Sequence, residues 1–358
     1  HPHPPRPRRH LCPRDGAPLG TRADGGRDPY LELRIAPGVE VERLVGQGSM
    51  GRVYRARQAG LERAVAVKIL RREHVRNPTF VARFLREGRV AAGLAHPNLV
   101  VVHAAGELDG DGEPYLVMEF LDGLSLRSAL VANDGGLPLL RALHVVLQVC
   151  AAIGEAHAHG VVHRDLKPEN VMLVPTSGDV DFVKVLDFGV ARVGEADSSL
   201  ATHAGAVLGT ATYACPESAR GEPVGYTGDV YSIATMLFEC CAGRPPFIGN
   251  GPVDVLIAHA TAPVPDVRSL PHGANIPAPI ARTIHRGLAK NPKDRPENAR
   301  ELGQALLRAA VESGLDLGRS LPRPDAETSP LRLPSTTAVV GSGVTRSVPA
   351  AGSSRGAS

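Results

Sequence analysis

The chain has 358 residues, roughly two to two and a half times the length of a typical single domain, and its 43% hydrophobic content predicts an ordinary buried core. Forty basic residues against 37 acidic ones leave a net charge of +3, which excludes a general attraction to nucleic acid and predicts no nucleic-acid partner. The five cysteines are irregularly spaced and odd in number, which excludes a secreted disulfide framework and predicts a reducing, cytoplasmic location.

Membrane insertion is not predicted, because no stretch reaches about 18 uninterrupted apolar residues. The most apolar region, Leu139 to Val162, contains Arg141, Gln148 and Glu155 and predicts a buried helix. The N-terminus lacks the apolar core of a signal peptide, and it begins with His rather than Met, so we expect a fragment or a processed product. The sequence predicts a soluble chain without a membrane span.

Both ends of the chain differ in composition from its middle. Residues 1–36 are rich in Pro, Arg and Gly without periodicity and predict a flexible arm. Within this arm, the segment that starts at Cys12 resembles one half of a zinc-ribbon knuckle, but a single cysteine cannot build a four-cysteine site. Residues 313–358, rich in Ser, Thr, Pro and Gly beyond residue 318, predict a disordered tail.

The middle of the chain changes character near residue 120. Its first part predicts short strands, at Val41–Val45, Arg52–Arg57, Arg63–Ile69, Val100–Glu107 and Tyr115–Phe120. One helix, Thr79 to Leu94, interrupts these strands. The second part predicts mainly helices, among them Leu139–His159, Gly228–Ala242, Val253–Ala260 and Ile280–Ala289. A strand-rich small lobe before a helical large lobe predicts a ligand-binding cleft between them.

A glycine-rich stretch lies at the start of the small lobe, with Gly46, Gly48 and Gly51 followed by Val53. Glycines let a backbone turn approach phosphate oxygens closely and present N–H groups without a side chain in the way. Alone, the pattern is weak and is more often that of an ordinary turn. Because a strand rather than a helix is predicted after Gly51, the pattern argues against a dinucleotide-binding fold.

A single lysine, Lys68, interrupts the apolar strand from Val65 to Leu70. Its ammonium group could extend to solvent. Next to a glycine turn it would instead meet phosphate charge, and it would need a carboxylate partner. Glu87, on the amphipathic run after Phe80, is the candidate, although on its own it would be interpreted as part of a solvated helix face.

The most specific string is His163-Arg-Asp-Leu-Lys-Pro-Glu-Asn170. Asp165 can accept a hydroxyl proton, Lys167 can neutralise a transferring phosphoryl group, and Asn170 can bind a metal through its amide oxygen. An exposed polar loop would not explain these residue types at these offsets. Seventeen residues after Asn170, Asp187-Phe-Gly189 follows an apolar segment and offers a carboxylate for Mg²⁺.

In this order the motifs resemble the signature set of the eukaryotic-type protein kinase family, in its bacterial serine/threonine branch. Cys215-Pro-Glu217 stands where Ala-Pro-Glu is usual, and Lys167 and the Gly209-Thr210 pair before Tyr213 are similar to serine/threonine kinases. The resemblance covers residues 39 to 312. It implies an α+β, bilobal protein kinase fold over residues 37–312, with a β-rich N-lobe at 37–118, a hinge at 119–123 and a mainly α-helical C-lobe at 124–312.

The resemblance also implies ATP- and Mg- or Mn-dependent transfer of a phosphoryl group to Ser/Thr hydroxyls of proteins. Asp165 would be the catalytic base, Lys167 would contact the γ-phosphate, Lys68 would bind the α- and β-phosphates while paired with Glu87, and Asn170 and Asp187 would hold the metal. ATP would be contacted by the small-lobe and hinge positions Val45, Gly46, Gly48, Gly51, Val53, Ala66, Lys68, Met118, Glu119 and Leu121, and by Leu173 of the large lobe.

Three further roles follow from the resemblance. Thr210 would dock the substrate, and Glu217 and Arg295 would form a buried ion pair. Arg164 needs an anion, which predicts autophosphorylation of the segment between Gly189 and Glu217, with Ser198, Ser199 and Thr202 as the candidate sites. A homodimer for this reaction stays open. The turn between Val174 and Phe182 is unusually long, and we interpret it as a tolerated surface loop.

Alternatives within related folds stay open at this point. A pseudokinase that binds nucleotide without transfer is disfavoured, because every charged catalytic position is filled. A small-molecule kinase is disfavoured, because such enzymes lack the segment from Gly209 to Glu217. Protein substrates, activating signal and oligomeric state are not predicted. Lysine is rare beside arginine, which predicts a specific role at each of its five positions, Lys68, Lys167, Lys184, Lys290 and Lys293.

Overall fold

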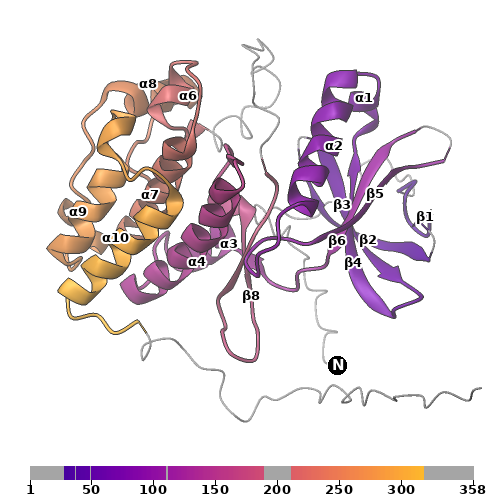
Figure 1. The fold of residues 1–358 in the computed structure, drawn as a ribbon, viewed down its shortest axis with the longest axis horizontal. Coiled ribbons are helices and arrows are strands. Elements are labelled where there is room, and N and C mark those ends of the chain that lie inside the picture. The colour runs from indigo at the N-terminus through magenta and orange to yellow at the C-terminus, as the bar shows by residue number, and fades with distance from the viewer. Residues whose placement is uncertain (1–27, 37, 49, 110–111, 189–210, 318–358) are drawn as a thin grey trace, which may run out of the picture. The chain divides into compact units, whose positions relative to one another are not determined.

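The computed structural model describes residues 28–36, 38–48, 50–109, 112–188 and 211–317. In these residues a strand-rich small lobe precedes a helical large lobe, which confirms the predicted α+β, two-lobe architecture (Figure 1).

The small lobe is one antiparallel sheet with the strand order β1-β2-β3-β4-β6-β5, and two helices follow β4 in the chain. All five predicted strands and the predicted helix are present, with ends shifted by a few residues. The elements are β1 Arg34–Ala36, β2 Val39–Gln47, β3 Gly51–Gln58, β4 Arg63–Leu70, α1 Arg72–Val75, α2 Pro78–Ala92, β5 Val102–Glu107 and β6 Pro114–Glu119.

Strand β4 is buried on both faces, and the alternation of its side chains between these faces determines where Lys68 points. Val67 and its alternate neighbours pack into an apolar cluster with β1, β2 and β3. Ala66 and Leu70 belong to a second cluster that includes Phe84 of α2. Because side chains alternate between the two faces of a strand, Lys68 lies on the face covered by α2. This placement directs the only charged side chain of the buried part of β4 toward that helix.

The sheet begins before residue 37, so the prediction of a flexible arm over residues 1–36 is wrong for residues 28–36. Strand β1 pairs with β2, and Tyr30 is only 4% exposed. The Tyr30 hydroxyl donates to Glu113 at 2.8 Å, and the Tyr54 hydroxyl donates to Asp28 at 3.0 Å. The Pro- and Arg-rich composition of the whole arm concealed one short segment that contains aromatic and branched side chains. Residues 1–27, with the half-knuckle at Cys12, lie outside the described part of the chain.

The large lobe is built around two buried helices, α4 and α7 (Figure 1). Every residue of α7 from Gly228 to Ala242 is buried, including the charged Asp229 and Glu239. Helix α10, which the sequence did not single out, packs against α4. The helices are α3 Leu126–Ala132, α4 Leu139–Ala158, α6 Pro216–Ala219, α7 Tyr226–Ala242, α8 Pro252–Thr261, α9 Ala278–Gly287 and α10 Ala299–Glu312, with short 3₁₀ turns at Pro168–Asn170, Val267–Ser269, Pro271–Gly273 and Pro292–Asp294.

Helix α4 is, by length and composition alone, apolar enough to cross a membrane. In the described part of the chain, 56% of the most apolar stretch of this helix is buried inside the protein, where its side chains pack against α7 and α10. This burial is typical of a core helix and agrees with the buried helix predicted for the region.

A small three-stranded sheet, β7-β8-β9, carries the residues on either side of the long turn between Val174 and Phe182. Its strands are β7 Leu124–Ser125, β8 Val171–Val174 and β9 Phe182–Val185. Residues 175–178 of the turn are exposed, as expected of a surface loop, and contacts to α4 hold its second half in place. Arg141 binds Asp181 through two bonds of 2.8 Å, and His144 lies 2.8 Å from Asp179.

Replacing Tyr30 by alanine tests whether residues 28–36 are part of the folded lobe. The change removes a buried aromatic ring and its hydrogen bond to Glu113, so we expect the free energy of unfolding to fall by about 3–5 kcal/mol in urea titrations. Leu61→Ala, at a side chain that is 63% exposed, is the control and should change it by less than about 0.5 kcal/mol. Equal effects of the two variants would contradict the docking of this segment.

Candidate active site

The glycine-rich stretch forms the turn between β2 and β3. The Gly48 N–H donates to the Gly51 carbonyl at 2.8 Å, and β3 starts at Gly51, so the predicted strand after the turn is present. A side chain at Gly51 would not fit, because an added Cβ would lie 2.6 Å from the Ile69 carbonyl oxygen. The close packing of this turn on β4 therefore requires glycine at this position.

Lys68 connects both lobes. Its Nζ lies 2.8 Å from Glu87 Oε1 on α2 and 2.9 Å from Asp187 Oδ1 in the large lobe. The Lys68 and Glu87 side chains are 5% and 8% exposed, so this is a buried ion pair of the kind the sequence predicted. Asp187 has a φ of 45°, a strained value for a residue other than glycine. An ammonium held between two carboxylates in this way is positioned to meet a further anion.

The three predicted catalytic-loop side chains lie together. Lys167 Nζ is 2.7 Å from Asp165 Oδ2. Asn170 donates from Nδ2 to the Asp165 carbonyl at 2.8 Å and to its carboxylate at 3.2 Å. The Asp165 and Lys167 side chains are 23% and 19% exposed, so both remain accessible to a substrate. This arrangement can accept a proton from a hydroxyl group and neutralise a nearby negative charge.

Asp229 of α7 supports this loop, a role the sequence reasoning missed. Its buried carboxylate accepts the backbone N–H groups of His163 and Arg164, each at 2.8 Å, and lies 2.9 Å from His157 Nε2. Arg164 has a φ of 66°, so these bonds hold a strained backbone in place. An acidic side chain near the start of a mostly apolar helix was the available signal.

His163 joins the catalytic loop to the segment that carries Asp187. Its Nε2 lies 3.0 Å from the Leu186 carbonyl, and its ring centroid lies 4.9 Å from that of Phe188. Burial lowers the pKa of His163, although nearby Asp229 and the Leu186 hydrogen bond oppose this effect. The neutral ring therefore donates its Nε2 hydrogen to Leu186.

The predicted metal ligands fit a divalent cation. The Leu186 N–H donates to the Asn170 carbonyl at 2.8 Å, which brings the segments of Asn170 and Asp187 side by side. Because Asn170 uses its amide nitrogen for Asp165, its amide oxygen is the atom it can offer to a cation. A carboxylate and an amide oxygen suit Mg²⁺ or Mn²⁺. Among the described residues there is no cluster of three or more His, Cys, Asp or Glu that could hold a metal alone, so other ligands would come from a substrate or water.

Apolar side chains predicted to contact adenine lie near the start of the hinge. Val53, Ala66 and Met118 belong to one cluster, and Ala66 pairs with Met118 across β4 and β6. Leu173 on β8 lies beneath the hinge, where an added Cβ at Gly123 would lie 2.2 Å from the Leu173 carbonyl oxygen.

The remaining ATP-site positions flank this apolar group. Val45 lies on β2, Gly46 is buried next to it, and Leu121 is half-buried in the hinge. Glu119 ends β6, and its carboxylate lies 2.7 Å from Lys184 Nζ and accepts the Val101 N–H at 2.8 Å. These contacts tie the hinge to β9, the strand that leads to Asp187.

The predicted ion pair between Glu217 and Arg295 is present. Two hydrogen bonds, of 2.9 and 2.7 Å, join the guanidinium and the carboxylate, and the Arg295 side chain is 0% exposed. Arg295 also donates to the carbonyls of Ala289, Thr227 and Lys290. Every donor of the buried guanidinium is therefore bonded, as a buried charge requires.

Segment 211–215 is held by the two helices beneath it. Ser232 of α7 donates to the Tyr213 carbonyl at 2.8 Å, and His259 Nε2 lies 2.8 Å from the Thr212 carbonyl. The Tyr231 hydroxyl lies 2.8 Å from His259 Nδ1. Gly189, Thr210 and the candidate phosphosites Ser198, Ser199 and Thr202 lie outside the described residues.

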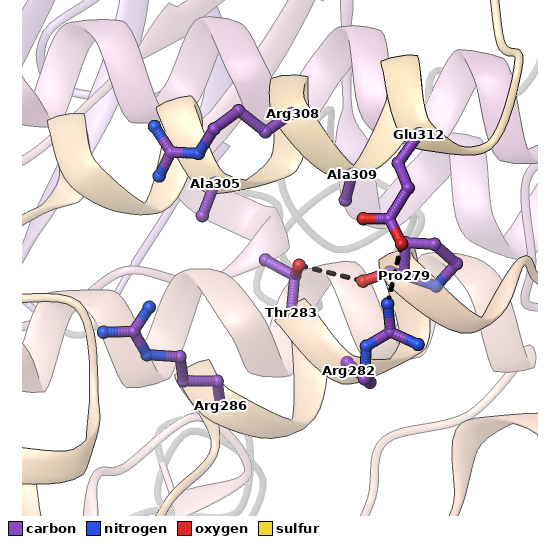
Figure 2. Close-up of a pocket in the computed structure, with 8 residues that line it drawn as sticks. All are labelled: Pro279, Arg282, Thr283, Arg286, Ala305, Arg308, Ala309 and Glu312. Atoms are coloured by element: carbon purple, nitrogen blue, oxygen red, sulfur yellow. Dashed lines mark hydrogen bonds and ion pairs between the residues drawn. The ribbon is translucent and has the colours of Figure 1, made fainter.

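A groove elsewhere on the large lobe is separate from these residues. It lies between α9 and α10, and Figure 2 shows Arg282, Arg286 and Arg308 around a floor that includes Ala305 and Ala309. None of the predicted catalytic, nucleotide or metal residues lines this groove. The candidate site is therefore the one built around Lys68, Asp165 and Asp187.

Comparisons with known proteins show the family to which the chain belongs. Residues 39–306 match the family model described as protein kinase domain. The chain is 42% identical to serine/threonine-protein kinase PknB of Mycobacterium leprae, over 80% of this chain and 44% of the relative. It is 39% identical to serine/threonine-protein kinase pkn3 of Myxococcus xanthus, over 86% of this chain and 56% of the relative. The crystal structure of the Mycobacterium tuberculosis PknI kinase domain superposes with a TM-score of 0.60 at 27% identity, covering 79% of this chain and 100% of that one. The chain spans about half the length of the curated relatives it matches.

Breaking the buried ion pair between Glu217 and Arg295 should lower the free energy of unfolding far more than breaking an exposed ion pair. Glu217→Gln leaves Arg295 buried without a counter-charge, so we expect the free energy of unfolding to fall by about 3–5 kcal/mol. Glu312→Gln is the matched control, since Glu312 and Arg282 are 61% and 66% exposed, and its effect should be about 0–1 kcal/mol. Urea denaturation of both variants measures the difference, and a small effect of Glu217→Gln would refute a structural role for the pair.

His259 should make the large lobe sensitive to acid. Burial lowers the pKa of His259 from its usual 6.5 to about 4, so the folded state keeps the ring neutral where the unfolded chain already binds a proton. Its contribution to stability is complete above pH 6.5 and is lost as the pH falls through about 4, a loss of about 3 kcal/mol. Urea titrations from pH 7.5 to 3.5 measure it, and His259→Gln should flatten the profile. His159→Gln, at an exposed ring, should leave the profile unchanged; identical profiles for both variants would exclude His259 as the cause.

Proposed function

Because the chain belongs to the protein kinase family, we propose that it transfers the γ-phosphoryl group of ATP to Ser and Thr hydroxyls of proteins. The observation that carries the proposal is the Lys68 ammonium, 2.8 Å from Glu87 and 2.9 Å from Asp187, in one site with Asp165 and Lys167. Preference for Ser and Thr is supported by Lys167 and by the printed names of the relatives PknB and pkn3. No observation favours a pseudokinase, because each charged position of the site is filled.

In the proposed reaction, the substrate hydroxyl oxygen bonds to the γ-phosphorus while the bond from that phosphorus to the ADP oxygen breaks. Asp165 accepts the hydroxyl proton, and Lys167, 2.7 Å from Asp165, neutralises charge on the transferred group. Asn170 holds the Asp165 backbone and carboxylate in place through its amide nitrogen. The protein thus contributes positioning and charge neutralisation rather than a covalent intermediate.

Nucleotide binding would use both lobes. The turn of Gly46, Gly48 and Gly51 would cover the phosphates, and Lys68 would contact the α- and β-phosphates. Adenine would lie among Val45, Val53, Ala66, Met118 and Leu173, with backbone hydrogen bonds to Glu119 and Leu121. Asn170 and Asp187 would hold Mg²⁺ or Mn²⁺, which when bound neutralises the phosphate oxygens.

We also propose that the chain phosphorylates its own segment between Gly189 and Glu217. Arg164 supports this, because its Nε is buried and has no hydrogen-bond partner in the described part of the chain. A phosphate would supply the missing acceptor and counter-charge. Ser198, Ser199 and Thr202 remain the candidate sites, Thr210 the substrate-docking residue, and a homodimer the arrangement in which one copy phosphorylates another.

A cytoplasmic location is proposed from the thiols. Cys150, Cys215, Cys240 and Cys241 are all free among the described residues, and cysteines that form no disulfides are typical of a reducing compartment.

Asp165→Asn should slow transfer strongly without abolishing nucleotide binding. Removing the proton acceptor should slow phosphate incorporation from γ-labelled ATP by about 10²–10⁴-fold. The site for ATP is untouched, so ATP with Mg²⁺ should raise the melting temperature of the variant as it does that of the unmodified chain. Filter binding and thermal melts measure the two effects.

The same samples test the activation segment. Intact-mass and peptide mapping should find phosphate between Gly189 and Glu217 in the unmodified chain and none in Asp165→Asn. Binding of ATP without transfer by the unmodified chain would refute the proposed activity, and full activity of a wholly unphosphorylated segment would refute the autophosphorylation proposal alone.

A further inference from the structure

Four side chains form a closed network between the helix after the hinge and the centre of the large lobe. Arg127 of α3 donates from Nε to Glu169 at 2.9 Å and from Nη1 to Glu239 at 2.8 Å. Its Nη2 donates to the Tyr213 hydroxyl, which in turn donates to the second carboxylate oxygen of Glu239. The guanidinium carbon also lies 5.9 Å from the centroid of the Tyr213 ring. One arginine therefore bonds to three different segments of the chain.

The charges of this network depend on that arginine. Two carboxylates face a single guanidinium, and the Glu239 side chain is only 6% exposed. Burial raises the pKa of Tyr213 well above its usual value, and Glu239 raises it further, so the phenol stays a neutral donor. Burial alone would lower the pKa of Arg127, but Tyr213, Glu239 and Glu169 outweigh burial and raise it. Without Arg127, two carboxylates would remain together without a counter-charge.

Under the proposed function, Arg127 joins two segments that a protein substrate would meet. Glu169 lies in the 3₁₀ turn of the catalytic loop, directly before Asn170 and four residues after Asp165. Tyr213 lies three residues after Thr210, in the segment that ends at Glu217. Ser232 and His259 hold the backbone of this segment from beneath, on α7 and α8. Arg127 adds a direct connection from the segment to the catalytic loop.

We propose that Arg127 is a positioning residue for protein substrates, which fixes the substrate-docking segment around Tyr213 at a set distance from the catalytic loop. The inference rests on the proposed kinase function. Arg127 contacts neither the Lys68 ion pair nor the Asp165 carboxylate, so its loss should disturb the binding of the protein substrate more than that of ATP. A purely structural bridge would instead change stability alone.

The test compares Arg127→Met with Arg141→Met in the full chain. Arg141 is the matched control, because it also joins a large-lobe helix to a loop through an ion pair, in this case with Asp181. None of its hydrogen bonds reaches the docking segment. The substrate is a Ser-containing peptide selected with the unmodified chain from a randomised library, and KM is measured separately for the peptide and for ATP.

For Arg127→Met we expect the KM for the peptide to rise roughly tenfold, because a charged hydrogen-bond network is lost. The KM for ATP should change by less than about twofold. Arg141→Met should lower the melting temperature without changing either KM. Arg127→Lys, which keeps the charge but lacks the planar fork, should give an intermediate KM for the peptide.

A second variant keeps the inference testable if Arg127→Met folds poorly. Tyr213→Phe removes only the hydroxyl through which Arg127 and Glu239 hold the segment. Its KM for the peptide should rise, and the double variant with Arg127→Lys should show less than the product of the two single effects. Unchanged KM for the peptide in both single variants, or equal changes for peptide and ATP, would overturn the inference. Absence of transfer in the unmodified chain would refute the proposed function instead.

Discussion

The buried carboxylate of Asp229 is the contact on which the catalytic loop depends. It is 1% exposed within the most completely buried helix of the large lobe, and it bonds to two consecutive backbone N–H groups, those of His163 and Arg164. Because Arg164 adopts a strained positive φ, the loop needs this external acceptor to keep its shape. Helix α7 thus forms the fixed support of the loop that carries Asp165, and this loop is anchored to the large-lobe core.

The small lobe contributes one charged side chain to the site, Lys68, and the geometry of its strand determines where this side chain points. Alternation along β4 turns Lys68 toward α2, where Glu87 meets it, while its second partner, Asp187, belongs to the large lobe. Lys68 therefore connects α2 of the small lobe to the large-lobe segment that carries Asp187. Lys184 adds a second connection, since it bonds to Glu119 at the hinge from the strand that leads to Asp187.

The sequence predicted the elements from patterns that are local in the chain, and the charged site residues from motifs that resemble those of a known family. Strand alternation, helix periodicity and the spacing of His163 to Asn170 depend on neighbouring residues, and each was recovered within a few positions. The missed features all depend on partners distant in sequence. Asp229 serves a loop 65 residues away, and Arg127 reaches Glu239, 112 residues away. Tyr30 is ordered by Glu113, a partner 83 residues away that the composition of the arm does not reveal.

Lysine and arginine make different kinds of contact in this structure. Arginine holds segments together where a planar fork meets several acceptors, as Arg295 does for Glu217 and three carbonyls. Lysine occurs where a compact charge approaches a carboxylate or a group of carbonyl oxygens. Four of the five lysines make such contacts, Lys68 with Glu87 and Asp187, Lys167 with Asp165, Lys184 with Glu119, and Lys290 with the carbonyls of Ala258 and His259. Because an ammonium offers no fixed fork, it can turn toward a new anion without breaking a bidentate pair. The rare lysines Lys68 and Lys167 are therefore suited to charge that arrives and leaves during a reaction, and Arg295 to charge that stays.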